Sequence, residues 1–242
     1  MERLIHTAVS GAELAQTALR ITANNLANVN TTGFKADMEQ AQAMQVRGDG
    51  YRTRFQAQLM PVATDIQPGA MMETGRDLDV AVNGKGFIAV QDAAGNEAYT
   101  RTGELQVDAN GALTVNGFSV MGAGAAIQLP EFGDIDIGAD GTINLLPVGG
   151  GVVEQDQRIK LVDSEGVSMI KGADGLFRPQ DREDLAQSDA ISLRTGVLEG
   201  SNVNAVEEMV STMNVSRQFE MNLRMMKTAD ELAVSGNKLI SG

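Results

Sequence analysis

The chain has 242 residues, of which 43% are hydrophobic, 21% charged and 4% aromatic, which is typical of one or two globular domains with an aliphatic core. The formal net charge of −13 argues against nucleic acid or an anionic membrane as the main partner, and the absence of cysteine excludes disulfides and thiolate ligands. The sequence shows no run of about 18 apolar residues and no signal-peptide pattern in its first thirty residues, so we expect neither a spanning helix nor a cleaved export signal.

The first 36 residues are predicted to form a helix, because small and apolar side chains recur there at alternating spacings of three and four. This stripe consists of Ile5, Ala8, Ala12, Ala15, Leu19, Thr22, Leu26 and Val29. Such spacing predicts a heptad seam against a partner helix. Since most of its side chains are small, each buries little apolar area, and the seam should be weak on its own.

The middle of the chain is predicted to be β structure. Residues 37–80 alternate poorly and contain two prolines, which indicates an extended connector with room for a short strand. Further on, residues 87–91 and 97–101 form a predicted hairpin around a turn at 92–96. Three segments place Asn-Gly or Asp-Gly before an apolar residue and predict tight strand-to-strand turns; they are DANGAL (108–113), GADGTI (138–143) and GADGLF (172–177).

A second, longer helix is predicted to begin at Asn204, with Glu207 three residues later in a capping-box arrangement. The apolar stripe that follows has one slip around residues 213–219 and consists of Val206, Met209, Met213, Ser216, Phe219, Leu223, Met226, Ala233 and Ile240. At about 1.5 Å per residue the helix would extend on the order of 50 Å. A helix of this length needs a long partner.

Charge divides the chain at the same places. Residues 1–36 carry a net charge of +1 and residues 203–242 a net charge of −1, so the middle carries the whole excess of −13. Helices that are nearly neutral can pack side by side without large repulsion, whereas a concentrated acidic segment is better placed in solvent. The charge pattern therefore predicts packed terminal helices and a solvent-exposed central domain.

No residue pattern predicts catalysis or metal binding. The single histidine, His6, lies beside the stripe of the first helix without a nucleophile motif, which favours a structural or solvent-facing role. The GKG sequence at 84–86 lacks the spacing of a phosphate-binding loop and is predicted to be a turn. Asp134, Asp136 and Asp140 lack the ligand spacing of a calcium loop and are predicted to be solvated turn carboxylates. We therefore expect no enzyme activity, cofactor or metal.

The segment NNLANVNTTGFK (24–35) ends the first helix with polar residues and a glycine that permits a turn before Phe34. It resembles the N-terminal signature of the flagellar rod and hook protein family. The resemblance continues in RDLDVAVNGKGFIAV (76–90), YTRTGELQVDANGALTVNG (99–117) and GVLEGSNVNAVEE (196–208). The closing stretch RQFEMNLRMMKTADELAVSGNKLIS (217–241) is most similar to the proximal-rod members of the family, with the distal rod as the nearest alternative.

The resemblance implies an α+β fold whose terminal helices pair as a coiled-coil-like unit around a central all-β insert. The expected segments are an N-terminal assembly helix (1–36), an extended connector (37–80), a central β-rich domain (81–188), a return connector (189–202) and a C-terminal assembly helix (203–242). It also implies a structural subunit of the basal-body rod that polymerises into a drive shaft, with copies of itself and other rod proteins as partners. The resemblance further implies export through the flagellar type III apparatus to the periplasmic space. It implies no cofactor.

The assembly interface is expected to combine the two helical stripes with polar and turn residues at the helix ends. Its members are Ile5, Ala8, Ala12, Ala15, Leu19, Asn25, Leu26, Asn28, Val29, Gly33, Phe34, Asn202, Asn204, Val206, Met209, Met213, Phe219, Leu223, Met226, Ala233 and Ile240. The alternative from another functional class is a binding module whose β domain recognises a ligand such as cell-wall glycan. An aromatic cleft would favour that reading, but only nine Phe and Tyr residues are scattered through the chain.

Overall fold

The computed structural model describes residues 2–38, 41–45, 55–59, 63–147, 154–181 and 183–241. The chain forms two compact units. Unit 1 comprises Met1–Val29, Asp37–Ala63 and Val203–Gly242, and unit 2 comprises Asn30–Ala36 and Thr64–Asn202. The fold is α+β, as predicted. The five predicted segments are each continuous in the sequence, whereas each compact unit of the structure combines segments that are far apart in the sequence.

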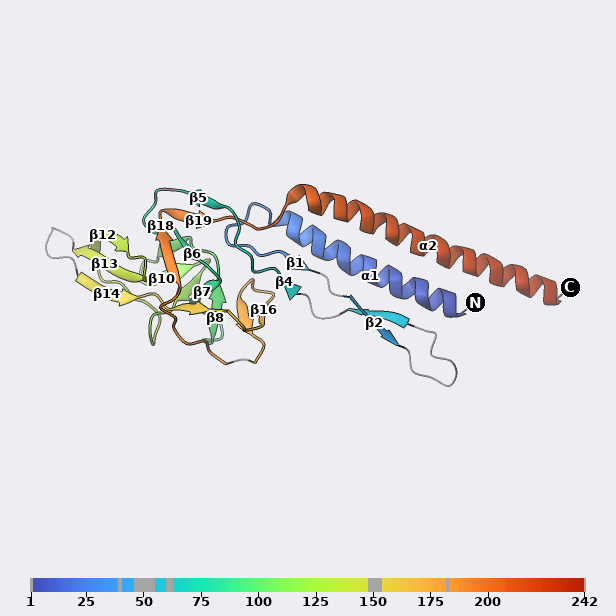
Figure 1. The fold of residues 1–242 in the computed structure, drawn as a ribbon, viewed down its shortest axis with the longest axis horizontal. Helices are drawn as coiled ribbons and strands as arrows, with labels where there is room; N and C mark the ends of the chain where they lie inside the picture. Colours follow the sequence, from blue (N-terminus) through green and yellow to red (C-terminus); the bar gives the residue numbers. More distant parts are fainter. Residues whose placement is uncertain are drawn as a thin grey trace. The chain divides into compact units, whose positions relative to one another are not determined.

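Unit 1 is built on two helices, α1 (Glu2–Ala27) and α2 (Ala205–Ser241), which lie side by side (Figure 1). The predicted cap at Asn204 is confirmed, because its side-chain Oδ1 accepts a hydrogen bond from the backbone N–H of Val206 at 3.1 Å. Glu207, which was predicted to complete a capping box, is exposed. Neither helix, within the described residues, is long and apolar enough to cross a membrane.

The predicted connector contains more strand than expected. A hairpin of β2 (Ala41–Gln45) and β3 (Phe55–Leu59) lies with β3 against α1, and β1 (Asp37–Met38) pairs with β4 (Ala63–Thr64). In FQAQL the apolar residues alternate with glutamine, which is the period of a strand, whereas AQAMQ breaks this alternation at Met44. The rest of the connector between residues 38 and 63, including Pro61, lies outside the described residues.

Among its described residues, unit 2 contains strands and no helix. The largest sheet is antiparallel, runs in the order β16-β17-β8-β7-β11-β10-β9, and has β15 paired to β7. Its strands are β7 (Gly86–Gln91), β8 (Glu97–Thr100), β9 (Leu105–Val107), β10 (Leu113–Val115), β11 (Phe118–Val120), β15 (Leu161–Asp163), β16 (Met169–Lys171) and β17 (Phe177–Pro179). Smaller antiparallel sheets are formed by β12 (Phe132–Ile137), β13 (Thr142–Pro147) and β14 (Glu154–Arg158), by β6 (Val80–Asn83) with β18 (Ser192–Thr195), and by β5 (Met71–Glu73) with β19 (Val197–Glu199).

The predicted hairpin and the three predicted turns are confirmed. Strands β7 and β8 pair around Gly95, and the other turns join β9 to β10, β12 to β13 and β16 to β17. The glycine of each turn, Gly95, Gly111, Gly141 or Gly175, has a φ between 78° and 87°. This left-handed conformation is the one that the Gly, Asn-Gly and Asp-Gly signals predicted.

The core of unit 2 lies on both faces of β7. Ile88 and Val90 enter a large cluster of buried Val, Ile, Leu and Ala side chains. Phe87 and Ala89 point to the opposite face, where the rings of Phe87 and Phe177 lie 5.0 Å apart. Successive side chains of a strand alternate between faces, so one strand organises both layers. The main cluster is aliphatic, as the low aromatic content predicts.

Candidate functional site

The inner stripe of α1 is made of small side chains. Its buried residues are Ala8, Ala12, Ala15, Ala18, Thr22 and Asn25. Of the remaining predicted positions in the helix, Ile5, Leu19 and Leu26 are half-buried, as is Val29 just beyond it. The larger Leu19 and Leu26 therefore flank the stripe, and the smaller Ala18 and Asn25 occupy its centre.

The facing stripe of α2 repeats at alternating spacings of four and three. It consists of Glu208, Thr212, Val215, Phe219, Asn222, Met226, Ala229 and Ala233, all buried or half-buried. Phe219, Met226 and Ala233 were predicted in the stripe. The structure leaves Val206, Met209, Met213 and Leu223 exposed in the single chain, while Ile240 belongs to α2 with its side chain outside the description. The stripe begins with polar residues, which is why hydrophobic spacing alone selected a neighbouring face.

Polar contacts join the two helices. Nδ2 of Asn25 donates to Oε1 of Glu208 at 2.9 Å, and the hydroxyl oxygens of Thr22 and Thr212 lie 3.2 Å apart. Asn25 also exchanges hydrogen bonds with the backbone of Asp37, each at 2.9 Å. Thr22, Asn25, Asp37 and Glu208 border a cavity of about 270 Å³ whose walls come from α1, β1 and α2. Polar contacts thus take part in joining the helices at this end of the pair.

Near the middle of the pair, Asn222 packs on Gly11. A Cβ atom at Gly11 would lie 3.1 Å from both amide atoms of Asn222, so the close approach depends on glycine. The Asn222 side chain is buried, and its Nδ2 has no hydrogen-bond partner among the described residues. A buried polar group in an otherwise small-residue seam lowers its stability.

The outer surface of α2 carries exposed apolar side chains among charged ones such as Glu220 and Arg224. The large apolar side chains there have exposed fractions between 45% and 69%; they are Val206, Met209, Val210, Met213, Met221, Leu223, Met225, Leu232 and Val234. Near the start of the helix, a shallow hollow lies between Val206, Val210 and Val215. Exposed apolar side chains in this number make the outer surface of α2 a candidate contact surface.

Several predicted turn residues meet within unit 2. Gly33 has a φ of 68° and donates its N–H to the backbone oxygen of Glu199 at 2.7 Å. Nζ of Lys171 lies 3.8 Å from the centroid of the Phe34 ring. The side chain of Asn202 accepts the N–H of Ala36 at 2.8 Å and donates to backbone oxygens of residues 65 and 67. Asn28, by contrast, bonds locally to the backbone oxygen of Asn24.

The same part of unit 2 contains three buried charges, named here the Glu199 cluster: Lys35, Arg101 and Glu199. Oε1 of Glu199 accepts from Nζ of Lys35 at 2.5 Å, and its Oε2 accepts from Nη1 of Arg101 at 3.1 Å. All three side chains have an exposed fraction of 0%. Burial lowers the pKa of Lys35, and the hydrogen bond and charge of Glu199 oppose this effect.

Sequence reasoning did not single out the Glu199 cluster. Its members stand in the segments TTGFK, YTRTG and GVLEG, and the available signal was a charged residue within a largely apolar or small-residue context. The pairing itself could not be read from the sequence, because Lys35 and Glu199 are 164 positions apart.

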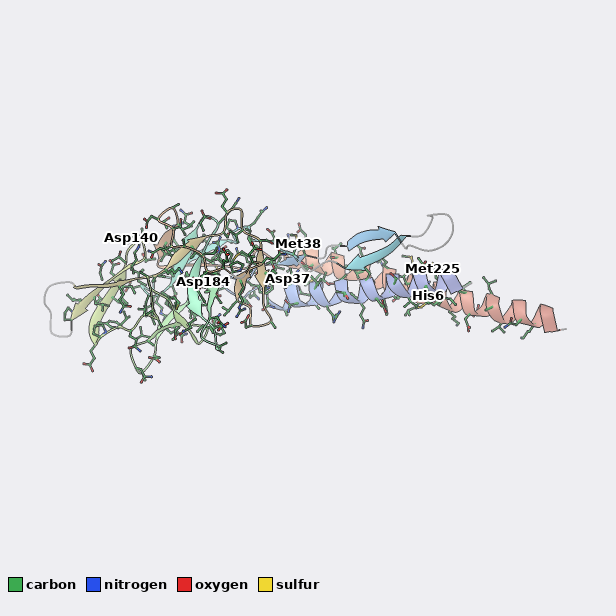
Figure 2. All side chains as sticks on the ribbon, turned by 90° about the horizontal axis from the view of Figure 1, so that it is seen from below. His6, Asp37, Met38, Asp140, Asp184 and Met225 are labelled. Carbon is green, nitrogen blue, oxygen red and sulfur yellow. The ribbon has the colours of Figure 1, made fainter. Side chains whose placement is uncertain are left out.

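The other polar candidates have ordinary surroundings. His6 is exposed on α1, and Asp140 is an exposed turn residue whose carboxylate accepts hydrogen bonds from the N–H and hydroxyl of Thr142 (Figure 2). Within the described ranges, no group of three or more His, Asp or Glu side chains is arranged to hold a metal ion. Asp134 and Asp136 are likewise exposed.

Three protein-family models match the chain, and together they include both helices and much of unit 2. Residues 5–35 match the family described as "Flagella basal body rod protein". Residues 81–145 match "Flagellar hook protein FlgE/F/G D1 domain", and residues 194–239 match "Flagellar basal body rod FlgEFG protein C-terminal".

Individual relatives are similar along their whole length. The chain is 39% identical to the flagellar basal-body rod protein FlgF of Escherichia coli and 38% identical to that of Salmonella typhimurium, covering 100% of this chain and 99% of each relative. It is 31% identical to the flagellar basal-body rod protein FlgG of Buchnera aphidicola subsp. Acyrthosiphon pisum, over 92% of this chain and 94% of the relative.

Proposed function

Because the chain belongs to the flagellar basal-body rod protein family, we propose that it is a subunit of the proximal rod, which polymerises through its terminal helices into the shaft that transmits motor torque. The observation that carries the proposal is the number of large apolar side chains exposed on the outer surface of α2. Contacts with neighbouring subunits would remove these side chains from water, and each Å² of apolar surface buried contributes about 25 cal/mol.

The proximal rod is favoured over the distal rod by similarity. The FlgF proteins of Escherichia coli and Salmonella typhimurium are 39% and 38% identical to the chain over its full length, against 31% for the FlgG relative described above. The closing sequence of α2, with RQFEMNLRMMK at 217–227, is also of the FlgF type. Localising the protein in purified basal bodies by labelled electron microscopy separates the two, and a label on the distal part of the rod would overturn the proximal assignment.

The helices are proposed to pair as a coiled-coil-like unit that becomes fully ordered only on assembly. The inner stripe of α1 contains four alanines, and the pair carries the polar contacts of Asn25, Thr22 and Asn222. Such a seam offsets little of the entropy lost when two long helices order. Hydrogen exchange on the monomer tests this, since strong protection throughout 5–29 and 206–240 would contradict it once oligomers are excluded.

Single substitutions test the role of the helices directly. We expect Leu26→Asp or Phe219→Asp to prevent incorporation into rods, because each places a charge beside the seam where both side chains are half-buried. Gln106→Asp adds the same charge at an exposed position of β9 and should leave assembly unchanged. Co-purification with basal bodies is the measurement, and normal incorporation of both helix variants would refute the assigned seam.

The remaining parts of the proposal concern partners and location. We propose that the subunit is exported through the flagellar type III apparatus without a cleaved signal, adds to other rod proteins in the periplasmic space, and needs no cofactor or catalytic site. Edman sequencing of the rod-incorporated protein tests the signal, because an intact N-terminus beginning at residue 1 or 2 supports the proposal and removal of a longer segment contradicts it.

A further inference from the structure

The Glu199 cluster belongs to unit 2 and includes segments that are next, along the chain, to the points at which the chain changes unit. The chain changes unit after residues 29, 36, 63 and 202. The unit 2 segments next to these points are 30–36, 64–69 and 199–202. Each of them contributes a hydrogen bond to Glu199 or to Asn202.

Glu199 bonds to segments 30–36 and 64–69. Its backbone oxygen accepts the N–H of Gly33, and its Oε1 accepts both Nζ of Lys35 and the N–H of Gly69, the latter at 2.8 Å. Its Oε2 binds Arg101, whose guanidinium also donates to the backbone oxygens of Val82 and Gly84. One carboxylate thus connects segments 30–36 and 64–69 to Arg101, and Arg101 in turn binds β6 and the turn that follows it.

The charges of the cluster depend on Glu199. Two cations and one anion are buried together, and the ring of Phe87 lies 5.1 Å from the guanidinium carbon of Arg101. Without the carboxylate, Lys35 and Arg101 would be two buried like charges, which is far less favourable than a buried pair with its counter-charge. Segment 30–36 carries Lys35, so release of this segment into water would relieve that repulsion.

We propose that Glu199 is the positioning residue that docks segment 30–36 into unit 2, so that the chain segments leading to α1 and α2 are held together at one buried carboxylate. The inference rests on the proposed function, since in a rod subunit any force passing along the chain between the helices and unit 2 enters through these segments. It assigns a role to the lysine of the TTGFK sequence and to the glutamate of GVLEG.

Hydrogen exchange on the full-length purified chain tests the proposal. Lys35→Met keeps the Glu199–Arg101 pair but removes the bonds of Nζ to Glu199 and to the backbone oxygen of Gln67. We expect the amides of Gly33 and Ala36 to exchange at least tenfold faster, while amides of the β7–β8 hairpin change less than twofold. Unchanged exchange at Gly33 and Ala36 would overturn the proposal.

A charge rescue separates positioning from general stability. Glu199→Gln should release segment 30–36 more than Lys35→Met does, because it leaves two buried cations. Adding Lys35→Met to Glu199→Gln removes one cation and should slow exchange at Gly33 again. If exchange in the double variant is as fast as in Glu199→Gln or faster, or if the single variant loosens unit 2 uniformly, Glu199 acts as an ordinary structural residue and the proposal fails.

A matched control uses another ion pair of unit 2. Glu97 lies 2.7 Å from Lys160, with exposed side-chain fractions of 9% and 15%. Glu97→Gln removes a carboxylate by the same chemistry and should leave exchange in segment 30–36 unchanged. Because these measurements use the isolated chain, they report on docking alone. Failure of the wild-type protein to enter basal bodies would instead refute the proposed function.

Discussion

Replacing Gly33 with alanine isolates the close approach on which the docking of segment 30–36 depends. A Cβ atom at this position would lie 2.5 Å from the backbone nitrogen of Thr102 and 2.6 Å from the carbonyl carbon of Arg101. These are backbone atoms, so no side-chain rotation can relieve the overlap. The variant must either shift the backbone at 101–102 or release segment 30–36.

While segment 30–36 stays docked, the φ of 68° at Gly33 disfavours any residue with a Cβ by about 1–2 kcal/mol, and this conformational part adds to the steric overlap. Release of the segment relieves both but breaks its hydrogen bonds to the rest of unit 2, each contributing about 1 kcal/mol net. These bonds run from Gly33 to Glu199, from Thr102 to the backbone oxygen of Thr32, from Ala36 to Asn202 and from Lys35 to the backbone oxygen of Gln67. Gly33→Ala should therefore lower the free energy of unfolding of unit 2 by about 3–4 kcal/mol.

Gly75 provides the matched control, because it has almost the same φ, 70°, with no atom within 4 Å of a Cβ placed there. Gly75→Ala should show only the conformational part, about 1–2 kcal/mol. Urea unfolding of both full-length variants, followed by circular dichroism, gives the two losses. Surface substitutions usually change stability by no more than about 0.5 kcal/mol. If the losses of the two variants agree within that margin, the steric reasoning is refuted.

Two further predictions concern α2 and the turns. Leucine has nearly the same shape as asparagine, and Asn222→Leu removes the unpartnered buried Nδ2. The substitution should therefore raise the free energy of unfolding of the helix pair by about 1 kcal/mol, measured by urea titration at 222 nm. The control Met225→Leu, at an exposed position, should leave it unchanged, and a lower stability of Asn222→Leu would contradict the reasoning. The pKa of Asp108 is lowered by the backbone N–H groups of Ala112 and Asn110, so the carboxylate stabilises the fold above its unfolded value of 3.8 and loses that effect as pH falls through the folded value. Asp108→Asn should therefore be less destabilising at pH 2.5 than at pH 6, and an equal effect at both values would contradict the assignment.

Local signals in the sequence predicted local structure well. The turns at Gly111, Gly141 and Gly175 follow from Asn-Gly and Asp-Gly pairs, since each needs only one residue with a positive φ. The start of α2 follows from the side chain of Asn204, which caps its own helix. Strands β2 and β3 lie in the segment predicted to be an extended connector with room for a short strand, where poor alternation and two prolines did not indicate a hairpin.

Contacts between distant segments were not predictable in the same way. The seam of α2 includes Glu208, Thr212 and Asn222, which a hydrophobic pattern ignores, and only the partner residues on α1 make these positions interior. Segment 30–36 was assigned to the first helix by sequence order. In the structure it belongs to unit 2, where Lys35 meets a glutamate from the other end of the chain.

The sequence by itself determined the class of the protein: two nearly neutral terminal helices, an acidic β-rich middle with its turns, and motifs of the flagellar rod family. These features are encoded by periodicity, by glycine placement and by short segments that act within a few residues. The tertiary structure decided which face of α2 is covered and why Lys35, Arg101 and Glu199 can be buried at all. A buried charge is stable only when an opposite charge lies next to it, and a local sequence pattern does not show which distant residue supplies that charge.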